Sequence, residues 1–335
     1  MILRRGLIIF FTVLALIIFL VLGTCFIIFR GPSPTARDML TLSLLETSAM
    51  KWVPALFITG GMVDKIVEYN SVVVSSVITD TSLVAFTPDS VNFSDSSADD
   101  EWADYPDGIR IEKFLGGTYR AYVMLIRDPS RLYVATSSDF TRGEPGLRIL
   151  EVARREDAIA GINGGGFPDE TGSGPGDVPI GLVFSNGRRM WGDENTVYQS
   201  VIGFNQDNVL IVGNFSVRAA REMGIRDALC FGPTLVVNGE PMEIRGIGSG
   251  LNPRSAIGQR ADGTVILLCV DGRMSSSLGA AISDLIEIML RYGAVNASNL
   301  DGGTSTTLVY NNELVNVFSN LYGPRRIPTF FMVRK

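Results

Sequence analysis

The alternation of apolar and polar residues divides the 335-residue chain into an N-terminal hydrophobic run and a longer mixed part. Residues 7–29 contain no charged side chain. A helix of this length spans roughly 35 Å at about 1.5 Å per residue, enough to cross a hydrocarbon core of about 30 Å. Basic residues flank the run, and a Gly-Pro-Ser-Pro sequence follows it. The pattern predicts a cytoplasmic tip and an uncleaved transmembrane signal anchor in residues 1–30, with the bulk of the chain extracellular.

Three further segments differ in their residue pattern. Residues 31–74 show helical periodicity with a break at Gly60-Gly61, which predicts a helical stalk or spacer, or a helical pair lying against the membrane or the domain. Residues 75–107 are rich in Ser, Asp and Thr around an acidic cluster, which predicts a linker. Residues 108–335 then predict one domain.

The apolar segments of this domain predict a large sheet. Strands are expected at residues 119–126, 132–136 and 265–270, the last of them buried on both faces. Hairpin turns are expected at Asn186-Gly187, Asn238-Gly239, Asp262-Gly263 and Asn311-Asn312. Helices are expected at residues 148–157 and 280–292, the second capped by Ser275–Ser277. The predicted fold class is α+β: a mixed, β-sheet-rich single catalytic domain with few helices, preceded by a transmembrane helix and a helical stalk.

The composition narrows the chemistry, because the chain contains no histidine. Ser-His-Asp and Cys-His dyads and histidine-based zinc sites are therefore excluded. A metal ion would need oxygen ligands, as calcium and magnesium do, and such a divalent cation is the cofactor that the sequence leaves open. The formal charge of −6 comes without a basic block, so nucleic acid is not an expected partner. Cys230 and Cys269 are expected to be buried thiols rather than a disulfide.

Four short motifs carry most of the polar chemistry. In chain order they are INGGGF at residues 162–167, NPRSAIG at 252–258, VDGR at 270–273 and NLDGGTST at 299–306. Each adjoins a strand-like segment, so distant parts of one domain are expected to build one polar site.

The last motif contains the first catalytic candidate, Asp301, as nucleophile, base or metal ligand. The N–H groups of Gly302 and Gly303 and the hydroxyls of Thr304 and Ser305 are candidates to contact an oxyanion or a phosphate. A capping role for Asp301 is the structural alternative.

The first motif places Gly164 and Gly165 directly after Asn163. Such glycines allow backbone N–H groups to approach an anion, although a surface loop explains them equally. In the same loop, Asp169, Glu170 and Asp177 are candidate ligands of a divalent cation.

Two arginines complete the candidate set. A guanidinium matches the geometry of a phosphate or a carboxylate, so Arg254 and Arg273 near one carboxylate suit an anionic sugar phosphate. Asp271 is the second candidate carboxylate. A structural salt bridge for either arginine, and a simple turn at Asp271-Gly272, are the alternatives.

The ordered set of motifs resembles the phosphodiester glycosidase family over residues 109–335. The family's motifs usually are NGGFF, NPRTA and LDGGGSS, so Gly166, Ser255 and Thr304 depart from them. The resemblance implies hydrolysis of a sugar-1-phosphodiester, which frees a sugar from a phosphorylated acceptor. Bacterial relatives are often linked to exopolysaccharide or cell-wall material, and such a substrate would suit the anchored, outward-facing domain expected from the N-terminal run. It also implies that the site is lined by Asn163, Arg254, Asp271, Arg273, Asp301 and the Gly302–Ser305 loop. The alternative is a non-catalytic surface module that binds anionic glycans through the same groove.

Overall fold

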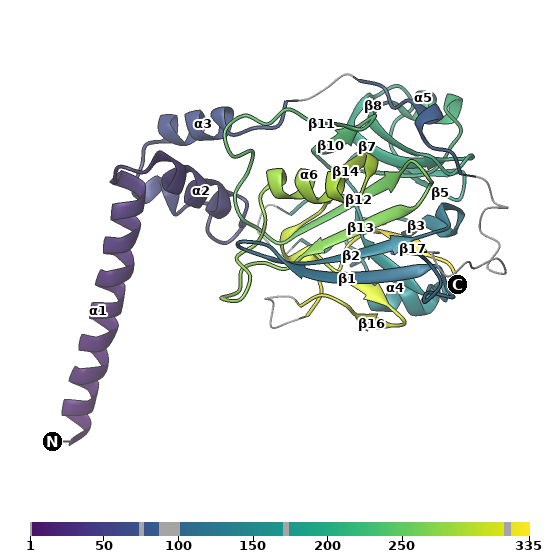
Figure 1. Cartoon of the computed structure of the whole chain (residues 1–335). Coiled ribbons are helices and arrows are strands. Elements are labelled where there is room, and N and C mark those ends of the chain that lie inside the picture. The colour runs from purple at the N-terminus through teal and green to yellow at the C-terminus, as the bar shows by residue number, and fades with distance from the viewer. Residues whose placement is uncertain (1, 74–76, 87–100, 170–173, 318–322) are drawn as a thin grey trace.

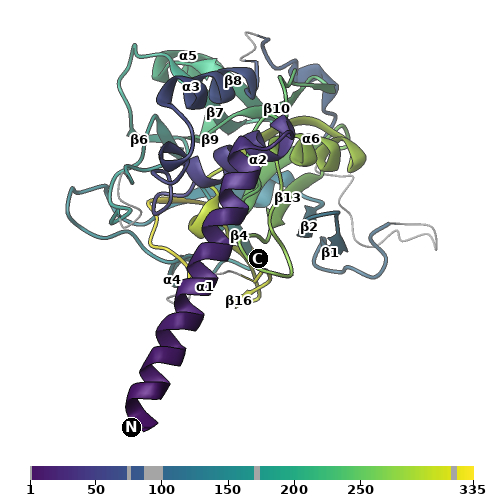
Figure 2. The ribbon, with the colours of Figure 1, turned by 90° about the vertical axis from the view of Figure 1, so that its left-hand side faces the viewer.

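The computed structural model describes residues 2–73, 77–86, 101–169, 174–317 and 323–335 (Figure 1). Helix α1 (Ile2–Arg30) projects from the folded part as a single rod in both views (Figures 1 and 2). Among the described residues it is the one helix that is long and apolar enough to cross a membrane. The apolar run therefore forms a helix, as predicted.

Three short helical elements follow the rod and pack against its C-terminal end. They are α2 (Pro34–Leu45), η1 (Pro54–Leu56) and α3 (Gly60–Tyr69). The Ser33 hydroxyl accepts a hydrogen bond from the Ala36 N–H in the first turn of α2. Pro34 is the first residue of the helix, where a backbone N–H would have no partner within the helix. The Phe29 and Phe57 rings stack at 4.9 Å. The predicted break at Gly60-Gly61 is instead the start of α3, because the chain leaves the helical conformation earlier, after α2.

The remaining chain forms three sheets in which the described strands pair antiparallel throughout. The seven-stranded sheet has the order β1 (Ile109–Leu115), β2 (Arg120–Ile126), β13 (Val265–Val270), β12 (Arg254–Arg260), β14 (Ala294–Leu300), β10 (Thr234–Val237) and β11 (Glu240–Pro241). A five-stranded sheet has the order β16 (Glu313–Leu314), β15 (Leu308–Tyr310), β4 (Ala160–Asn163), β17 (Thr329–Val333) and β3 (Leu132–Thr136). The third has the order β6 (Arg188–Trp191), β5 (Val183–Ser185), β9 (Ile225–Cys230), β7 (Tyr198–Asn205) and β8 (Leu210–Phe215).

Helices α4 (Ile149–Arg155), α5 (Val217–Glu222) and α6 (Ile282–Arg291) lie outside these sheets, so the α+β class is confirmed. All four predicted hairpin turns are present, between β5 and β6, β10 and β11, β12 and β13, and β15 and β16. The predicted cap of the last helix at Ser275–Ser277 is wrong. Helix α6 begins at Ile282, and the Asp284 carboxylate accepts a hydrogen bond from the N–H of Ala281. The Ser277 hydroxyl instead accepts from the Arg120 N–H and donates to the Asp271 carbonyl.

Strand β13 lies at the centre of the core and is buried on both faces, as predicted. Leu267 packs in the large apolar cluster shared by the three sheets. Leu268 lies on the other face, in the cluster that contains Leu285 and Met289 of α6. Cys230 and Cys269 are buried free thiols, which confirms that expectation. Burial of continuous apolar strands between two packed layers is the main source of stability in such a fold.

Segments upstream of β1 also contact the sheets. The N–H of Val73 donates to the Glu243 carbonyl, and Thr79 exchanges hydrogen bonds with the backbone of Val212. Trp102 is buried in the cluster under α6. Experiments on this protein therefore call for the full chain rather than a fragment that begins at β1.

We expect Leu267→Ala to destabilise the folded chain by roughly 2–5 kcal/mol, because it leaves a cavity at a fully buried position. Leu115→Ala is the matched control, since Leu115 is 72% exposed. Denaturant unfolding of the detergent-solubilised chain measures both. Equal unfolding midpoints for the two variants would contradict this account of the core.

Candidate functional site

A cavity of about 560 Å³ opens where the ends of β12 and β14 meet the loops that follow β4 and β9. Eight of the candidate residues line it: Asp169, Arg254, Arg273, Asp301, Gly302, Gly303, Thr304 and Ser305. Further lining residues include Glu46, Phe167, Phe231, Asn252, Asn299 and Arg325. The structure thus brings residues of all four motifs to one surface, together with residues that the motifs do not contain.

Asn163 lies at the end of β4 and connects the strand ends around the cavity. Its side-chain amide donates to the Asp301 carbonyl at 2.6 Å and accepts from the Ser255 hydroxyl at 2.7 Å and the Thr307 N–H at 3.0 Å. The residue is fully buried and does not line the cavity. In this arrangement Asn163 holds the turn that carries Asp301 and has no direct access to a ligand.

Asp301 follows β14, and its carboxyl group has a raised pKa. Burial raises its pKa to about 6, against the opposing effects of hydrogen bonds from the Ser305 side chain and the Gly302 N–H. The charge of Arg325 also lowers this pKa. A carboxyl group that titrates near neutral pH and opens on a cavity is suited to proton transfer or nucleophilic attack.

Arg273 approaches the Asp301 turn from the segment after β13. A Cβ atom on Gly303 would lie 3.3 Å from Nη2 of Arg273, so the guanidinium lies directly against this turn. Nε and Nη2 both donate to the Asn252 side-chain oxygen, at 3.2 and 3.0 Å. Burial lowers the pKa of Arg273, and the Glu46 carboxylate opposes that effect. A positive charge therefore lies beside the glycine turn and interacts with the Glu46 carboxylate.

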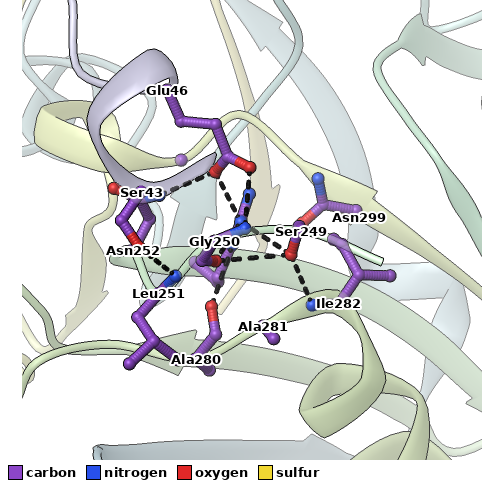
Figure 3. Close-up of polar contacts among 12 residues, drawn as sticks. Ser43, Glu46, Ser249, Gly250, Leu251, Asn252, Ala280, Ala281, Ile282 and Asn299 are labelled. Atoms are coloured by element: carbon purple, nitrogen blue, oxygen red, sulfur yellow. Dashed lines mark hydrogen bonds and ion pairs between the residues drawn. The ribbon is translucent and has the colours of Figure 1, made fainter. Parts of the chain in front are cut away.

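Arg254 begins β12, and its guanidinium is held by several partners. Nε donates to the Ala280 carbonyl at 3.2 Å, and Nη2 donates to the Gly250 carbonyl at 2.9 Å. Nη2 also forms an ion pair with Glu46 at 2.6 Å. Figure 3 shows Glu46 reaching this network from the helical segment above it. The sequence offered a phosphate ligand or a salt bridge for Arg254, and the structure contains the salt bridge within the cavity.

The glycines after Asn163 allow the backbone of this loop to pack closely against neighbouring strands. Gly164 and Gly165 donate to the carbonyl and the hydroxyl of Thr329, each at 3.0 Å, and Gly166 donates to the Cys230 carbonyl. A Cβ atom on Gly164 would lie 2.5 Å from the Thr329 carbonyl oxygen. The N–H groups of these glycines are therefore engaged inside the protein, and of the three only Gly166 lines the cavity.

Asp271, the second candidate carboxylate, lies outside the described lining of the cavity. One oxygen accepts from the Val317 N–H at 3.0 Å, and the other is 3.5 Å from Nη1 of Arg120. Burial raises the pKa of this group. Its partners indicate that it anchors the segment after β13, which also carries Arg273.

The candidate metal ligands are separated. Asp169 lines the cavity and pairs with Arg325, whose guanidinium stacks on Phe167 at 4.9 Å. Asp177 lies elsewhere and accepts from the Gly143 N–H, which lowers its pKa. Glu170 falls outside the described residues. Within the described ranges, no three acidic or thiol groups come together as metal ligands.

Glu46, Asn252, Asn299 and Arg325 also line the cavity, and none of them was a sequence-based candidate. Asn252 and Asn299 belong to two of the motifs, and their position beside strand ends was an available signal. Glu46 and Arg325 lie far from the motifs and reach the cavity through tertiary packing alone.

The phosphodiester glycosidase family model matches residues 156–334 of the chain. N-acetylglucosamine-1-phosphodiester alpha-N-acetylglucosaminidase of Bos taurus is 30% identical over 56% of this chain and 39% of its own length. The uncharacterized prophage-derived protein YomE of Bacillus subtilis is 29% identical over 58% of this chain and 29% of its own length. The chain thus spans less than half the length of these curated relatives.

One solved structure with a similar fold is the catalytic domain of the zebrafish N-acetylglucosamine-1-phosphodiester alpha-N-acetylglucosaminidase, auto-inhibited by its pro-peptide. The TM-score is 0.56 with 21% sequence identity, and the match covers 68% of this chain and 82% of that one. This likeness supports the α+β fold described above.

We expect Gly164→Ala to destabilise the chain by about 1–3 kcal/mol, because the new methyl group would overlap the Thr329 carbonyl. Gly117→Ala is the control, since nothing lies within 4 Å of a Cβ atom there. Thermal unfolding of the two purified variants provides the comparison. An unchanged melting temperature for Gly164→Ala would show that the loop is not packed as described.

Proposed function

The chain belongs to the phosphodiester glycosidase family, a family of hydrolases, and we propose that it cleaves the bond between a sugar C1 and the oxygen of a phosphodiester. The observation that supports this most is the joining of Asp301, Arg254 and Arg273 in one cavity. The proposed substrate class is the N-acetylglucosamine-1-phosphate type, following the printed activity of the bovine relative.

The cationic side of the cavity suits the leaving group. When the C1–O bond breaks, the phosphate gains a second negative charge, and fixed positive charge beside it lowers the barrier. Arg273 lies against the glycine turn, and Arg254 lines the same cavity, where it shares a carboxylate oxygen of Glu46 with Asn252. We assign the phosphate to the space between this wall and Gly302–Ser305. A phosphate monoester has a second pKa of about 6, so it can leave without a dedicated proton donor.

The carboxylate side suits activation of water or direct attack on C1. With a pKa of about 6, Asp301 is mostly ionised at neutral pH, which both roles require. As a base it takes a proton from water while the hydroxide adds to C1. As a nucleophile it forms a glycosyl ester that water then cleaves. In both routes water supplies the new sugar hydroxyl, and the phosphate leaves as a monoester.

The remaining walls suit a sugar ring. Phe167 and Phe231 provide apolar surface, as is usual around small polar ligands. The Asn299 amide donates to the Gly232 carbonyl at 2.8 Å, and among the described residues no donor reaches its oxygen. A buried acceptor without a partner costs free energy, and a sugar hydroxyl would satisfy it.

We further propose that α1 anchors the protein in the cell membrane as a single span with the catalytic domain outside. The support is the length and apolar character of the helix, and Arg4 and Arg5 before the apolar run favour a cytoplasmic N-terminus, although Arg30 and Arg37 partly offset this bias. A glycan of the cell wall or an exopolysaccharide would then be the accessible phosphorylated substrate, and no nucleic acid is expected to bind.

Asp301→Asn should reduce the release of free sugar from an N-acetylglucosamine-1-phosphodiester by roughly 10³-fold, because the amide can neither accept the proton nor attack C1. Free sugar is measured with the full chain in detergent. Asp207→Asn, at an exposed position outside the cavity, is the control for the loss of one carboxylate. Turnover by Asp301→Asn at the rate of the unmodified chain would remove Asp301 from the mechanism.

The pH profile should follow the raised pKa of Asp301. Because the ionised form is the active one, kcat/KM should be high above about pH 6 and should fall about tenfold per pH unit below it. The substrate diester keeps one negative charge across this range, so the profile reports on the protein. A rate that rises between about pH 7 and pH 5 would show instead that a protonated acid is required.

A further inference from the structure

Glu46 is a charged wall residue supplied by the segment that joins the apolar helix to the sheets. One of its carboxylate oxygens accepts from Nη2 of Arg254 at 2.6 Å and from the side-chain amide of Asn252 at 2.7 Å. The other accepts from the Gly250 N–H at 3.2 Å. These bonds appear in the close-up of Figure 3. The carboxylate thus stands next to the guanidinium assigned to the phosphate.

The packing of α2 against the segment before β12 fixes this position. The Ser43 hydroxyl accepts from the Leu251 N–H at 2.8 Å. A Cβ atom on Gly250 would lie 2.1 Å from the backbone nitrogen of Ser43, so only glycine permits this approach. Farther along, the Asn70 side chain accepts from the Ile247 N–H at 2.9 Å. Glu46 therefore reaches the cavity from the C-terminal end of α2, which is held in place by its packing against the segment before β12.

The charges that line the cavity balance when Glu46 is counted. The arginines are Arg254, Arg273 and Arg325, and the carboxylates are Glu46, Asp169 and Asp301. Without Glu46 the same cavity has one excess positive charge. That excess would be located at Arg254 and Arg273, because Arg325 is paired with Asp169 whereas the Glu46 carboxylate pairs with Arg254 and acts on the charge of Arg273.

The substrate and product of the proposed reaction differ in charge at the phosphate. A phosphodiester carries one negative charge, whereas a phosphomonoester is mostly a dianion at neutral pH because its second pKa is about 6. A fixed carboxylate next to the phosphate repels a dianion twice as strongly as a monoanion at the same position.

We propose that Glu46 is a specificity-determining residue that makes the phosphate position selective for monoanionic phosphodiesters over dianionic phosphomonoesters. This inference rests on the proposed function. It gives the helical segment beside the membrane a direct role in the site: it disfavours the phosphomonoester product and so promotes its release.

The test is a comparison of binding constants by calorimetry, with the full chain in detergent. The probes are N-acetylglucosamine 1-phosphate and its methyl phosphodiester, and Asp301→Asn is present throughout to prevent turnover. With Glu46→Gln added, the monoester should bind about tenfold more tightly and the diester about threefold more tightly, because the relieved repulsion scales with ligand charge. Glu68→Gln, which removes an exposed carboxylate from the neighbouring α3, should change neither constant.

Two results would overturn the inference. Equal tightening of both probes would mean that Glu46 only competes with the phosphate for Arg254. Weaker binding of both would mean that Glu46 merely holds Arg254 and Asn252 in place. If the unmodified chain hydrolyses the diester, either result removes the role of Glu46 and leaves the proposed function standing. No binding of either probe to any variant, together with no turnover, would reject the proposed function and this inference with it.

Discussion

The side-chain amide of Asn163 is the interaction on which the site depends. Its hydrogen bonds join the end of β4 to the Asp301 turn after β14, to Ser255 in β12 and to the approach to β15. These segments come from two different sheets. A buried amide that satisfies three partners fixes their relative position, because leaving any of them unpaired would be costly. The catalytic candidate is thereby held rigidly although it lies on a glycine-rich turn.

The second constraint connects the site to the N-terminal part of the chain. The C-terminal end of α1 packs on η1 through the Phe29–Phe57 stack, and α2 packs on the segment that leads into β12. Arg254 is the first residue of that strand, and Glu46 is its ion-pair partner. A continuous set of contacts therefore runs from the apolar helix to the cavity wall.

Much of this arrangement could be predicted from the sequence. The continuous apolar pattern of β13 and the Asn-Gly turns predicted the sheet, and the clustering of chemistry at strand ends predicted that Asp301, Arg273 and the glycine turn would meet. The side chains of Asn163 and Asp271 were placed at the right strand ends, but local sequence does not show which way a side chain points. Glu46 and Arg325 could not be predicted, because a single charged residue gives no local signal and reaches the cavity only through tertiary packing.

Under the proposed function, the cavity breaks the carbon–oxygen bond of the sugar rather than the phosphorus–oxygen bond. The most direct test is hydrolysis of an N-acetylglucosamine-1-phosphodiester by the full chain in ¹⁸O-labelled water, followed by mass spectrometry of both products. We expect the label to enter the hydroxyl at C1 of the sugar and the phosphomonoester to remain unlabelled. Label in the phosphate would contradict it, because water would then have attacked phosphorus.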